Sequence, residues 1–304
     1  MDACLLHFDD EAASAARLAA ATGLEARCIE RHRFPDGEIK VRLPLERAPL
    51  PQQVVLLRSL AQPNEKLVEL LLAAQTARSL GVRALTLVAP YLAYMRQDIA
   101  FTPGEAVSQR IVGGFLAGLF DAVLTVDPHL HRVHTLAEAI PLPEERALAL
   151  SAAPLLADCV VAHRPHAWLV GPDAESEQWV AQAAARHGLR WAVCGKRRHG
   201  DRRVEVTLPE GVNFAGAAVV LIDDVASTGH TLAEAARGLH AAGAASVDVA
   251  VTHALFAGDA LALLRAAGVG RVWSSDSVPH ETNAVPLAPL LAQGLAALPR
   301  ALLS

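Results

Sequence analysis

The chain has 304 residues, of which 52% are hydrophobic and 19% charged, and its formal net charge is −5. The hydrophobic fraction excludes a disordered or fibrous protein. The mild acidity argues against a general nucleic-acid binder, because such proteins usually carry a basic excess. No apolar run reaches the roughly 18 residues that a membrane-spanning helix needs, so we expect no membrane partner.

In chain order the pattern predicts strand 4–8, helix 9–22, strand 53–59, helix 64–80, strand 84–89, helix 105–120, strand 122–126, strand 168–170, a helix ending at 187, strand 191–194, strand 217–222, helix 232–242, strand 246–252, a helix near 259–267 and strand 271–274. This alternation predicts an α/β fold with two similar doubly wound domains, mainly parallel sheets and flanking helices. The stretch 141–146 is rich in Pro and Glu and is the predicted boundary, giving domains 1–143 and 144–304.

The cysteines and the N-terminus indicate the compartment. The four cysteines are far apart and form no Cys-x-x-Cys pair, which predicts free thiols in a reducing cytoplasm. The first residues lack the basic and apolar regions of a signal peptide. We therefore expect a cytoplasmic protein.

The strongest local motif is the segment 219–231, where an apolar strand leads into two aspartates and a Ser/Thr/Gly loop that opens a helix. Hydroxyl groups and the backbone N–H groups of a helix N-terminus can bind a phosphate, and the two carboxylates can accept hydrogen bonds from sugar hydroxyls. The alternative is an exposed Asp pair followed by an ordinary N-cap. The residues of this motif are Asp223, Asp224, Ser227, Thr228, Gly229, His230 and Thr231.

Other polar segments are less specific when taken alone. Arg96-Gln97-Asp98 could bind a phosphate and a base, or could be a solvated loop. The segment with Phe34, Asp36 and Glu38 offers a stacking face and two acceptors, or is an ordinary turn with Asp36-Gly37 at its tip. His129, His131 and His134 suggest zinc, but no Cys, Asp or Glu stands nearby at a suitable spacing.

Residues 196–203 form the only dense basic segment. It could be a solvated loop or an RNA-binding patch, but cationic groups also stabilise the charge that spreads over a phosphoryl group in transfer. Of the 27 basic residues only three are lysines. Lys40 follows the Phe34 segment, Lys66 is expected to be solvated on a helix, and Lys196 alone lies in this basic segment.

The motif at 219–231 resembles the phosphoribosyl-diphosphate fingerprint of type I phosphoribosyltransferase folds. Together with the segments at 33–39, 89–105, 126–129 and 196–198, the chain resembles the ribose-phosphate diphosphokinase family, and its archaeal-type class most closely. The resemblance covers residues 30–275 and implies an enzyme of nucleotide biosynthesis. It would transfer the diphosphoryl group of Mg-ATP to the 1-hydroxyl of ribose 5-phosphate, giving 5-phosphoribosyl 1-diphosphate and AMP.

The resemblance also implies residue roles. Lys196 and Arg198 would be catalytic, and His129 and Asp173 would hold Mg²⁺. The ribose 5-phosphate would be bound by the motif at 219–231. The Phe34 segment would contact adenine across a subunit interface, which implies a homo-oligomer of at least two subunits. The ATP-binding residues would be Phe34, Asp36, Glu38, Arg96, Gln97 and Asp98.

The sequence also departs from the family pattern, at Ile99, Ala100, Ala174, Glu175 and His230. These departures leave room for a different donor or acceptor. Two alternatives therefore stand beside the synthase: a non-catalytic regulatory subunit, and a phosphoribosyltransferase that consumes the diphosphate. The intact Lys196 and Arg198 argue against the first, and a second domain with Arg96-Gln97-Asp98 argues against the second.

Overall fold

Two compact units make up the chain. The computed structural model describes residues 3–46, 48–199 and 203–299, and at residues 196–199 and 203–205 it describes the backbone alone. Unit 1 comprises Met1–Leu150 and Leu287–Ser304, and unit 2 comprises Ser151–Pro286. The sequence-based boundary falls between residues 143 and 144, close to this division. The segment 287–304, which the sequence analysis assigns to the second domain, belongs to unit 1.

Unit 1 is built on a seven-stranded sheet in the order β3-β2-β1-β4-β5-β6-β7. All neighbouring strands are parallel except β3, which runs antiparallel to β2. Strands β4, β5 and β6 are buried along their whole length, because helices cover both faces of the sheet. The strands are β1 (Ala3–Phe8), β2 (Glu25–Arg33), β3 (Ile39–Arg42), β4 (Gln53–Leu57), β5 (Ala84–Ala89), β6 (Ala122–Val126) and β7 (Ala147–Leu150).

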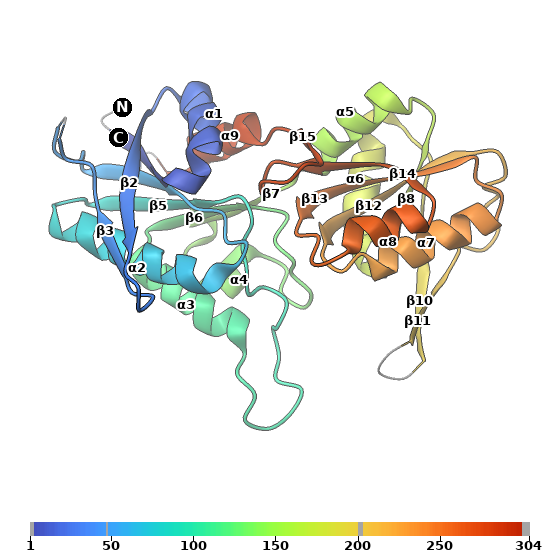
Figure 1. The fold of residues 1–304 in the computed structure, drawn as a ribbon, viewed down its shortest axis with the longest axis horizontal. Coiled ribbons are helices and arrows are strands. Elements are labelled where there is room, and N and C mark those ends of the chain that lie inside the picture. Colours follow the sequence, from blue (N-terminus) through green and yellow to red (C-terminus); the bar gives the residue numbers. More distant parts are fainter. Residues whose placement is uncertain (1–2, 47, 200–202, 300–304) are drawn as a thin grey trace. The chain divides into compact units, whose positions relative to one another are not determined.

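Helices α2 (Pro63–Ser79), α3 (Ser108–Leu119) and α4 (Leu136–Ala139) cover one face of this sheet, and α1 (Ala12–Thr22) and α9 (Ala288–Ala297) cover the other (Figure 1). Short 3₁₀ helices lie at Asp9–Glu11 and Glu144–Arg146. A Cβ atom at Gly294 of α9 would lie 2.7 Å from side-chain atoms of Leu124 and Leu150. The absence of a side chain there lets α9 approach β6 and β7 closely.

Unit 2 has a six-stranded parallel sheet in the order β15-β14-β13-β12-β8-β9 and a separate antiparallel pair, β10–β11. Helices α5 and α6 pack on one face of the sheet, and α7 and α8 on the other. The strands are β8 (Trp168–Gly171), β9 (Trp191–Val193), β10 (Gly195–His199), β11 (Arg203–Thr207), β12 (Ala218–Ala226), β13 (Ser246–Ala254), β14 (Val269–Ser275) and β15 (Asn283–Val285). The helices are α5 (Ala153–His163), α6 (Glu177–His187), α7 (His230–Ala241) and α8 (Ala260–Ala266), with a 3₁₀ turn at Ala174–Ser176.

The observed architecture confirms the predicted α/β class with mainly parallel sheets. Each strand of the sequence prediction overlaps an observed strand, whereas β2, β3, β7, β15 and the β10–β11 pair were not predicted. Strands β2 and β3 are rich in charged residues and mostly exposed or half-buried, so they carry no apolar run. Helix α3 begins at Ser108, three residues later than predicted, because the preceding segment forms a loop held by Glu105.

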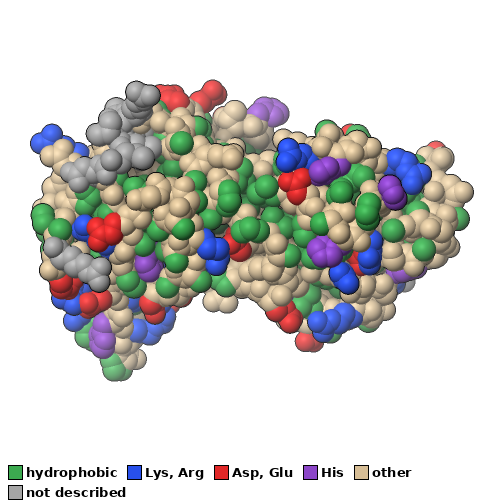
Figure 2. Space-filling model, turned by 90° about the horizontal axis from the view of Figure 1, so that it is seen from above, with side chains coloured by type: hydrophobic (Ala, Val, Ile, Leu, Met, Phe, Trp, Pro, Cys, Tyr) green, Lys and Arg blue, Asp and Glu red, His purple; other side chains and the backbone are tan. Residues whose placement is uncertain are grey.

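Surface charges show no concentration of one sign on the face in Figure 2, where Lys and Arg side chains are interspersed with Asp and Glu. Within the described residues, no helix has the length and apolar character needed to cross a membrane. The expectation that Lys66 is solvated is wrong. Its Nζ donates to the carbonyl oxygen of Ser59 at 2.6 Å, and burial together with the nearby Arg58 lowers its pKa.

Candidate functional site

The motif at 219–231 lies where the sequence analysis expects it, at the carboxyl end of β12. The strand carries Asp223 and Asp224 to the edge of the sheet, and the loop of Ser227, Thr228 and Gly229 leads directly into α7. Gly229 is the N-cap of α7 and has φ +74°, a left-handed conformation that glycine adopts without a steric penalty. The first N–H groups of a helix have no intrahelical partner, so this turn presents backbone donors to a ligand.

The side chains of this motif differ in exposure. Thr228 and His230 are exposed, Ser227 and Thr231 are half-buried, and Asp224 is buried. His230 stands where the family pattern often has a second glycine. Because its side chain is exposed at the first residue of α7, it does not fill the turn.

The two aspartates are held by the local backbone. The N–H group of Asp224 donates to Asp223 Oδ1 at 3.0 Å, and the N–H group of Val225 donates to Asp224 Oδ1 at 2.8 Å. Burial raises the pKa of Asp223 well above its usual value, and the neighbouring carboxylates of Asp224 and Asp173 raise it further. Three acidic groups that repel one another are suited to binding a cation or hydroxyl donors.

Asp173 reaches this cluster from the neighbouring strand, β8, which pairs with β12 in parallel. It caps the 3₁₀ turn that follows, where its Oδ1 accepts from the N–H group of Glu175 at 3.1 Å. Ser176 is buried and its hydroxyl donates to the Asp173 carbonyl oxygen at 2.5 Å. Cys194, at the end of β9, is also buried, and burial with the charge of Asp173 raises the pKa of its thiol to about 12. This cysteine is therefore an unreactive thiol.

In unit 1, the Phe34 segment forms the turn of the β2–β3 hairpin. The N–H group of Phe34 donates to the Glu38 carbonyl oxygen at 2.8 Å, and the N–H group of Glu38 donates to Asp36 Oδ1 at 3.1 Å. Phe34 is 39% exposed, and its ring packs edge-on against His32 with 4.7 Å between the ring centroids. The exposed face of Phe34 is available for stacking on a planar ligand.

The segment 96–98 follows β5, and its three side chains have different environments. Arg96 is exposed. Gln97 donates to Glu105 Oε1 at 2.9 Å and accepts from Ser108 Oγ at 2.7 Å. Asp98 is buried, and it accepts from Arg132 Nη1 at 2.6 Å and from the Arg132 N–H group at 3.1 Å. In this structure Asp98 orders the loop after β6, and Arg96 is the member of the three whose side chain is exposed.

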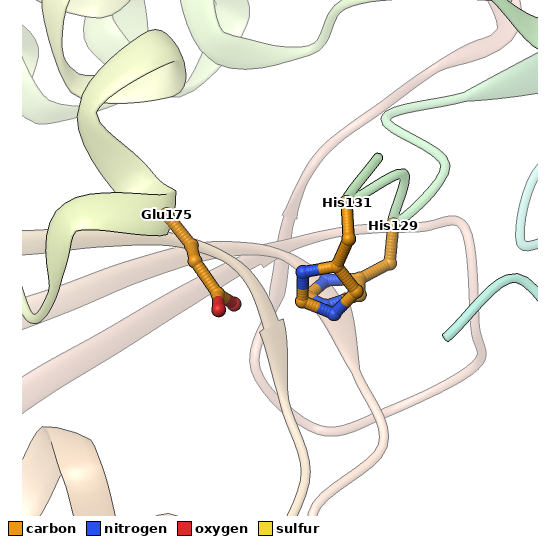
Figure 3. A group of neighbouring side chains, drawn as sticks. All are labelled: His129, His131 and Glu175. Atoms are coloured by element: carbon orange, nitrogen blue, oxygen red, sulfur yellow. The ribbon is translucent and has the colours of Figure 1, made fainter. Parts of the chain in front are cut away.

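His129 and His131 lie together in the loop that follows β6, as Figure 3 shows. Their Nε2 atoms are 2.9 Å apart, and the rings are nearly perpendicular with centroids 4.3 Å apart. Figure 3 also labels Glu175, which belongs to the 3₁₀ turn before α6 in unit 2.

The donor sets agree with the chemistry of Mg²⁺. Magnesium is bound through one or two carboxylates together with substrate phosphates. Asp173, Asp223 and Asp224 offer carboxylate oxygens in unit 2, where burial and the neighbouring carboxylates together raise the pKa of Asp223. An imidazole such as that of His129 is a less typical ligand for this ion than a carboxylate.

The basic segment with Lys196 and Arg198 is not the loop that the sequence suggests. Both residues lie in β10, which pairs with β11. In this register Lys196 is the backbone partner of Val206, and Arg198 is the backbone partner of Val204. The side chains of Lys196 and Arg198 lie outside the described part of the structure, as do residues 200–202. The pair β10–β11 extends from unit 2 in Figure 1.

Sequence reasoning missed several partners of these residues. It did not find Arg132 as the partner of Asp98, Glu105 as the partner of Gln97, or the proximity of Asp173 to Asp223. The last could have been inferred, because Asp173 and Asp223 both follow apolar strands whose carboxyl ends meet at one edge of a parallel sheet. The other two depend on loop conformations that no periodic pattern reveals.

Known proteins share both units. Residues 3–119 match the family model described as the N-terminal domain of ribose phosphate pyrophosphokinase, and residues 150–265 match the phosphoribosyl transferase domain. The chain is 35% identical over 286 residues to ribose-phosphate pyrophosphokinase of Methanopyrus kandleri, covering 92% of this chain and 94% of the relative. It is 34% identical over 292 residues to the enzyme of that name in Halobacterium salinarum, covering 96% of this chain and 100% of the relative.

A solved structure supports the fold. The crystal structure of phosphoribosylpyrophosphate synthetase from Mycobacterium smegmatis superposes with a TM-score of 0.82, with 98% of each chain covered and 23% sequence identity. The family models together match more than half of the chain, and the archaeal relatives extend over nearly all of it. This chain belongs to the ribose-phosphate pyrophosphokinase family.

Proposed function

We propose that the protein transfers the diphosphoryl group of Mg-ATP to the 1-hydroxyl of ribose 5-phosphate, giving 5-phosphoribosyl 1-diphosphate and AMP. The observation that carries this proposal is the cluster of Asp173, Asp223 and Asp224 beside the Ser/Thr/Gly turn that opens α7. It combines acceptors for sugar hydroxyls with donors for a phosphate at one sheet edge. Membership in the family supplies the reaction class.

In this proposal, unit 2 holds the acceptor. The turn of Ser227, Thr228 and Gly229 and the side chain of Thr231 bind the 5-phosphate, while Asp223 and Asp224 accept from ribose hydroxyls. His230 begins α7 with an exposed side chain, so it leaves the backbone donors of the turn accessible. Fixing the sugar at its phosphate and its diol leaves the 1-hydroxyl as the group that can be directed at the nucleotide.

Unit 1 holds the donor. The exposed ring of Phe34 stacks on adenine, and Asp36 and Glu38 accept hydrogen bonds at the same turn. Arg96 contacts the phosphates, and Gln97 and Asp98 order the loop around it. Because the family resemblance has the Phe34 segment contact adenine across a subunit interface, we propose that the working enzyme is a homo-oligomer of at least two subunits.

The transfer itself is an in-line displacement. The oxygen of the 1-hydroxyl forms a bond to the β-phosphorus of ATP, the bond from that phosphorus to the α–β bridging oxygen breaks, and AMP leaves as the hydroxyl proton is released. Lys196 and Arg198 stabilise the negative charge that spreads over the β-phosphoryl oxygens. Asp173 and His129 would each offer a ligand to Mg²⁺, which would supply further charge neutralisation when bound. Positioning and charge stabilisation suffice, so no covalent intermediate on the protein is required.

We also propose a cytoplasmic location for this activity. None of the four cysteines, all of which lie in the described part of the chain, forms a disulfide bond, which agrees with a reducing compartment. ATP, the donor in this proposal, is abundant there.

The proposal is tested with ATP labelled at the γ-phosphorus, Mg²⁺ and ribose 5-phosphate. The expected result is AMP, in amounts that depend on the sugar phosphate, with the label recovered in the sugar product. Formation of ADP instead would indicate a simple kinase and would contradict the proposal. Nucleotide binding without any turnover would favour the regulatory-subunit alternative.

A further inference from the structure

The hairpin that carries Phe34 is fastened to helix α2 by two ion pairs. Arg31 and Arg33 are two residues apart on β2, so their side chains point to the same face of the strand. Glu65 and Glu69 are four residues apart on α2 and share one face of the helix. Two strand residues span about 6.8 Å and four helix residues about 6 Å, so the two spacings match.

The contacts follow this spacing. Arg31 Nη1 donates to Glu69 Oε1 at 2.5 Å, and Arg33 Nη2 donates to Glu65 Oε1. We call these two pairs, Arg31–Glu69 and Arg33–Glu65, the ladder. Its outer pair is exposed, with Arg33 at 59% and Glu65 at 36%, and Arg33 directly precedes Phe34.

The inner pair is anchored in the core of unit 1. Glu69 is completely buried, and its second oxygen accepts from Arg58, which is also completely buried. Arg58 in turn pairs with Asp10 at 2.7 Å and lies 3.2 Å from Glu11. A buried carboxylate that accepts from two guanidinium groups has well-defined geometry, because each of its oxygens takes part in a charge-assisted hydrogen bond.

Beyond Ile29, where the pairing of β2 with β1 ends, the hairpin has few apolar anchors. Strand β3 pairs with β2, at the edge of the sheet, and Ile29 is the one fully buried side chain among β2 and β3. Apolar packing therefore contributes little to holding the turn at residues 34–38 in place. The ladder runs along β2 toward this turn and ends at the residue before it.

We infer that Glu65 and Glu69 are positioning residues for ATP: through Arg33 and Arg31 they hold the Phe34 turn in its nucleotide-binding conformation. This inference rests on the proposed role of the Phe34 segment. Pre-ordering the turn lowers the conformational cost of binding, so the ladder contributes to ATP affinity without touching ATP. Its effect is confined to the donor side, because the ribose 5-phosphate residues lie in unit 2.

The outer pair provides the cleanest test. We expect Glu65→Gln and Arg33→Gln each to raise the KM for ATP about two- to fivefold, since an exposed ion pair contributes up to about 1 kcal/mol and 1.4 kcal/mol is tenfold. The double variant should be no worse than either single one, and the charge-reversed pair, Arg33→Glu with Glu65→Arg, should recover most of the affinity. The kcat and the KM for ribose 5-phosphate should change less than twofold.

A matched control lies on the same hairpin. Glu30 of β2 pairs with Arg42 of β3, so this ion pair links the two strands of the hairpin to each other and not to α2. Glu30→Gln should leave the KM for ATP within twofold of the unmodified enzyme. If Glu30→Gln raised it as much as Glu65→Gln does, or if the Arg33 and Glu65 effects were additive, the ladder would have no positioning role.

The inner pair is tested with Glu69→Gln, which should raise the KM for ATP at least tenfold. Because this variant removes a buried charge, its folding is checked by circular dichroism, and the outer-pair variants carry the test if it does not fold. Equilibrium dialysis of ATP is run in parallel. If the unmodified enzyme binds ATP but makes no AMP, the proposed function fails, while the ATP dissociation constants of the variants still decide whether the ladder positions the turn.

Discussion

Gly229 gives the sharpest prediction, because it combines a left-handed backbone with a close neighbour in the turn proposed to bind the phosphate. A Cβ atom at this position would lie 3.4 Å from the Ala260 carbonyl oxygen, at the start of α8. Gly229→Ala therefore introduces backbone strain. The left-handed conformation costs an alanine roughly 1–2 kcal/mol, and because the added methyl group would be in van der Waals contact with Ala260, relief of this strain moves the backbone of the turn.

The expected loss of stability follows from these values. For a unit of this size, about 3–4 °C of Tm is lost per kcal/mol, so Gly229→Ala should lower the Tm by about 3–8 °C. The displacement of the backbone donors should weaken ribose 5-phosphate binding about 10- to 100-fold, because hydrogen bonds to a charged group contribute about 1.5–3 kcal/mol. Thermal unfolding followed by circular dichroism and titration calorimetry with ribose 5-phosphate measure the two effects separately.

Gly211 supplies the matched control. Its φ is +75°, against +74° at Gly229, and no heavy atom lies within 4 Å of a Cβ built there. Gly211→Ala should lose comparable stability and keep its ribose 5-phosphate affinity within twofold. Equal affinities in Gly229→Ala and Gly211→Ala would refute the assignment of this turn to the phosphate.

Three further changes test other parts of the site. Asp223→Asn should raise the Tm of the ligand-free protein in EDTA. The pKa of Asp223 is raised in the folded protein, so ionisation of this carboxyl lowers the stability as the pH increases. The same variant should abolish ribose 5-phosphate binding in calorimetry. Glu11→Gln should flatten the dependence of the unfolding free energy on pH between 4.5 and 7. Because burial raises the pKa of Glu11 to about 7, the stabilisation from its protonated form is complete below pH 4.5 and is lost as the pH rises toward 7. An unchanged pH profile would contradict this reasoning. Lys196→Ala should lower kcat roughly 100- to 1,000-fold in the AMP assay while leaving the dissociation constant of ribose 5-phosphate unchanged, and a kcat near that of the unmodified enzyme would remove Lys196 from the catalytic role.

The sequence predicts the buried parts of the fold well, for a physical reason. Strands such as β5 and β6 are covered on both faces, and their apolar runs give the observed bounds, 84–89 and 122–126. Strand β2 was not predicted, because Ile29 is the one buried apolar side chain on a face whose other members, Glu25, Arg27, Arg31 and Arg33, form ion pairs. Periodicity detects apolar burial and does not detect this kind of pairing.

In the candidate site, too, the sequence predicts some features and does not reveal others. The turn at 227–231 could be predicted because its chemistry is continuous in sequence. The buried environment of Asp98 could not, because its partner Arg132 is 34 residues away in a loop. The expectation for Lys66 is wrong for a related reason. Its position on α2 indicates a surface helix, whereas its ammonium group reaches back to the carbonyl oxygen of Ser59, near the buried side chains of Arg58 and Glu11.

Helix α9 gives unit 1 a property that concerns biosynthesis. The helix packs against α1 and, through Gly294, against β6 and β7, yet it belongs to the last part of the chain, after all of unit 2. During synthesis, residues 151–286, a continuous segment, therefore leave the ribosome before the helix that packs on the sheet of unit 1. The ribosome begins unit 1 first, but unit 2 is the first to have all of its sequence available for folding.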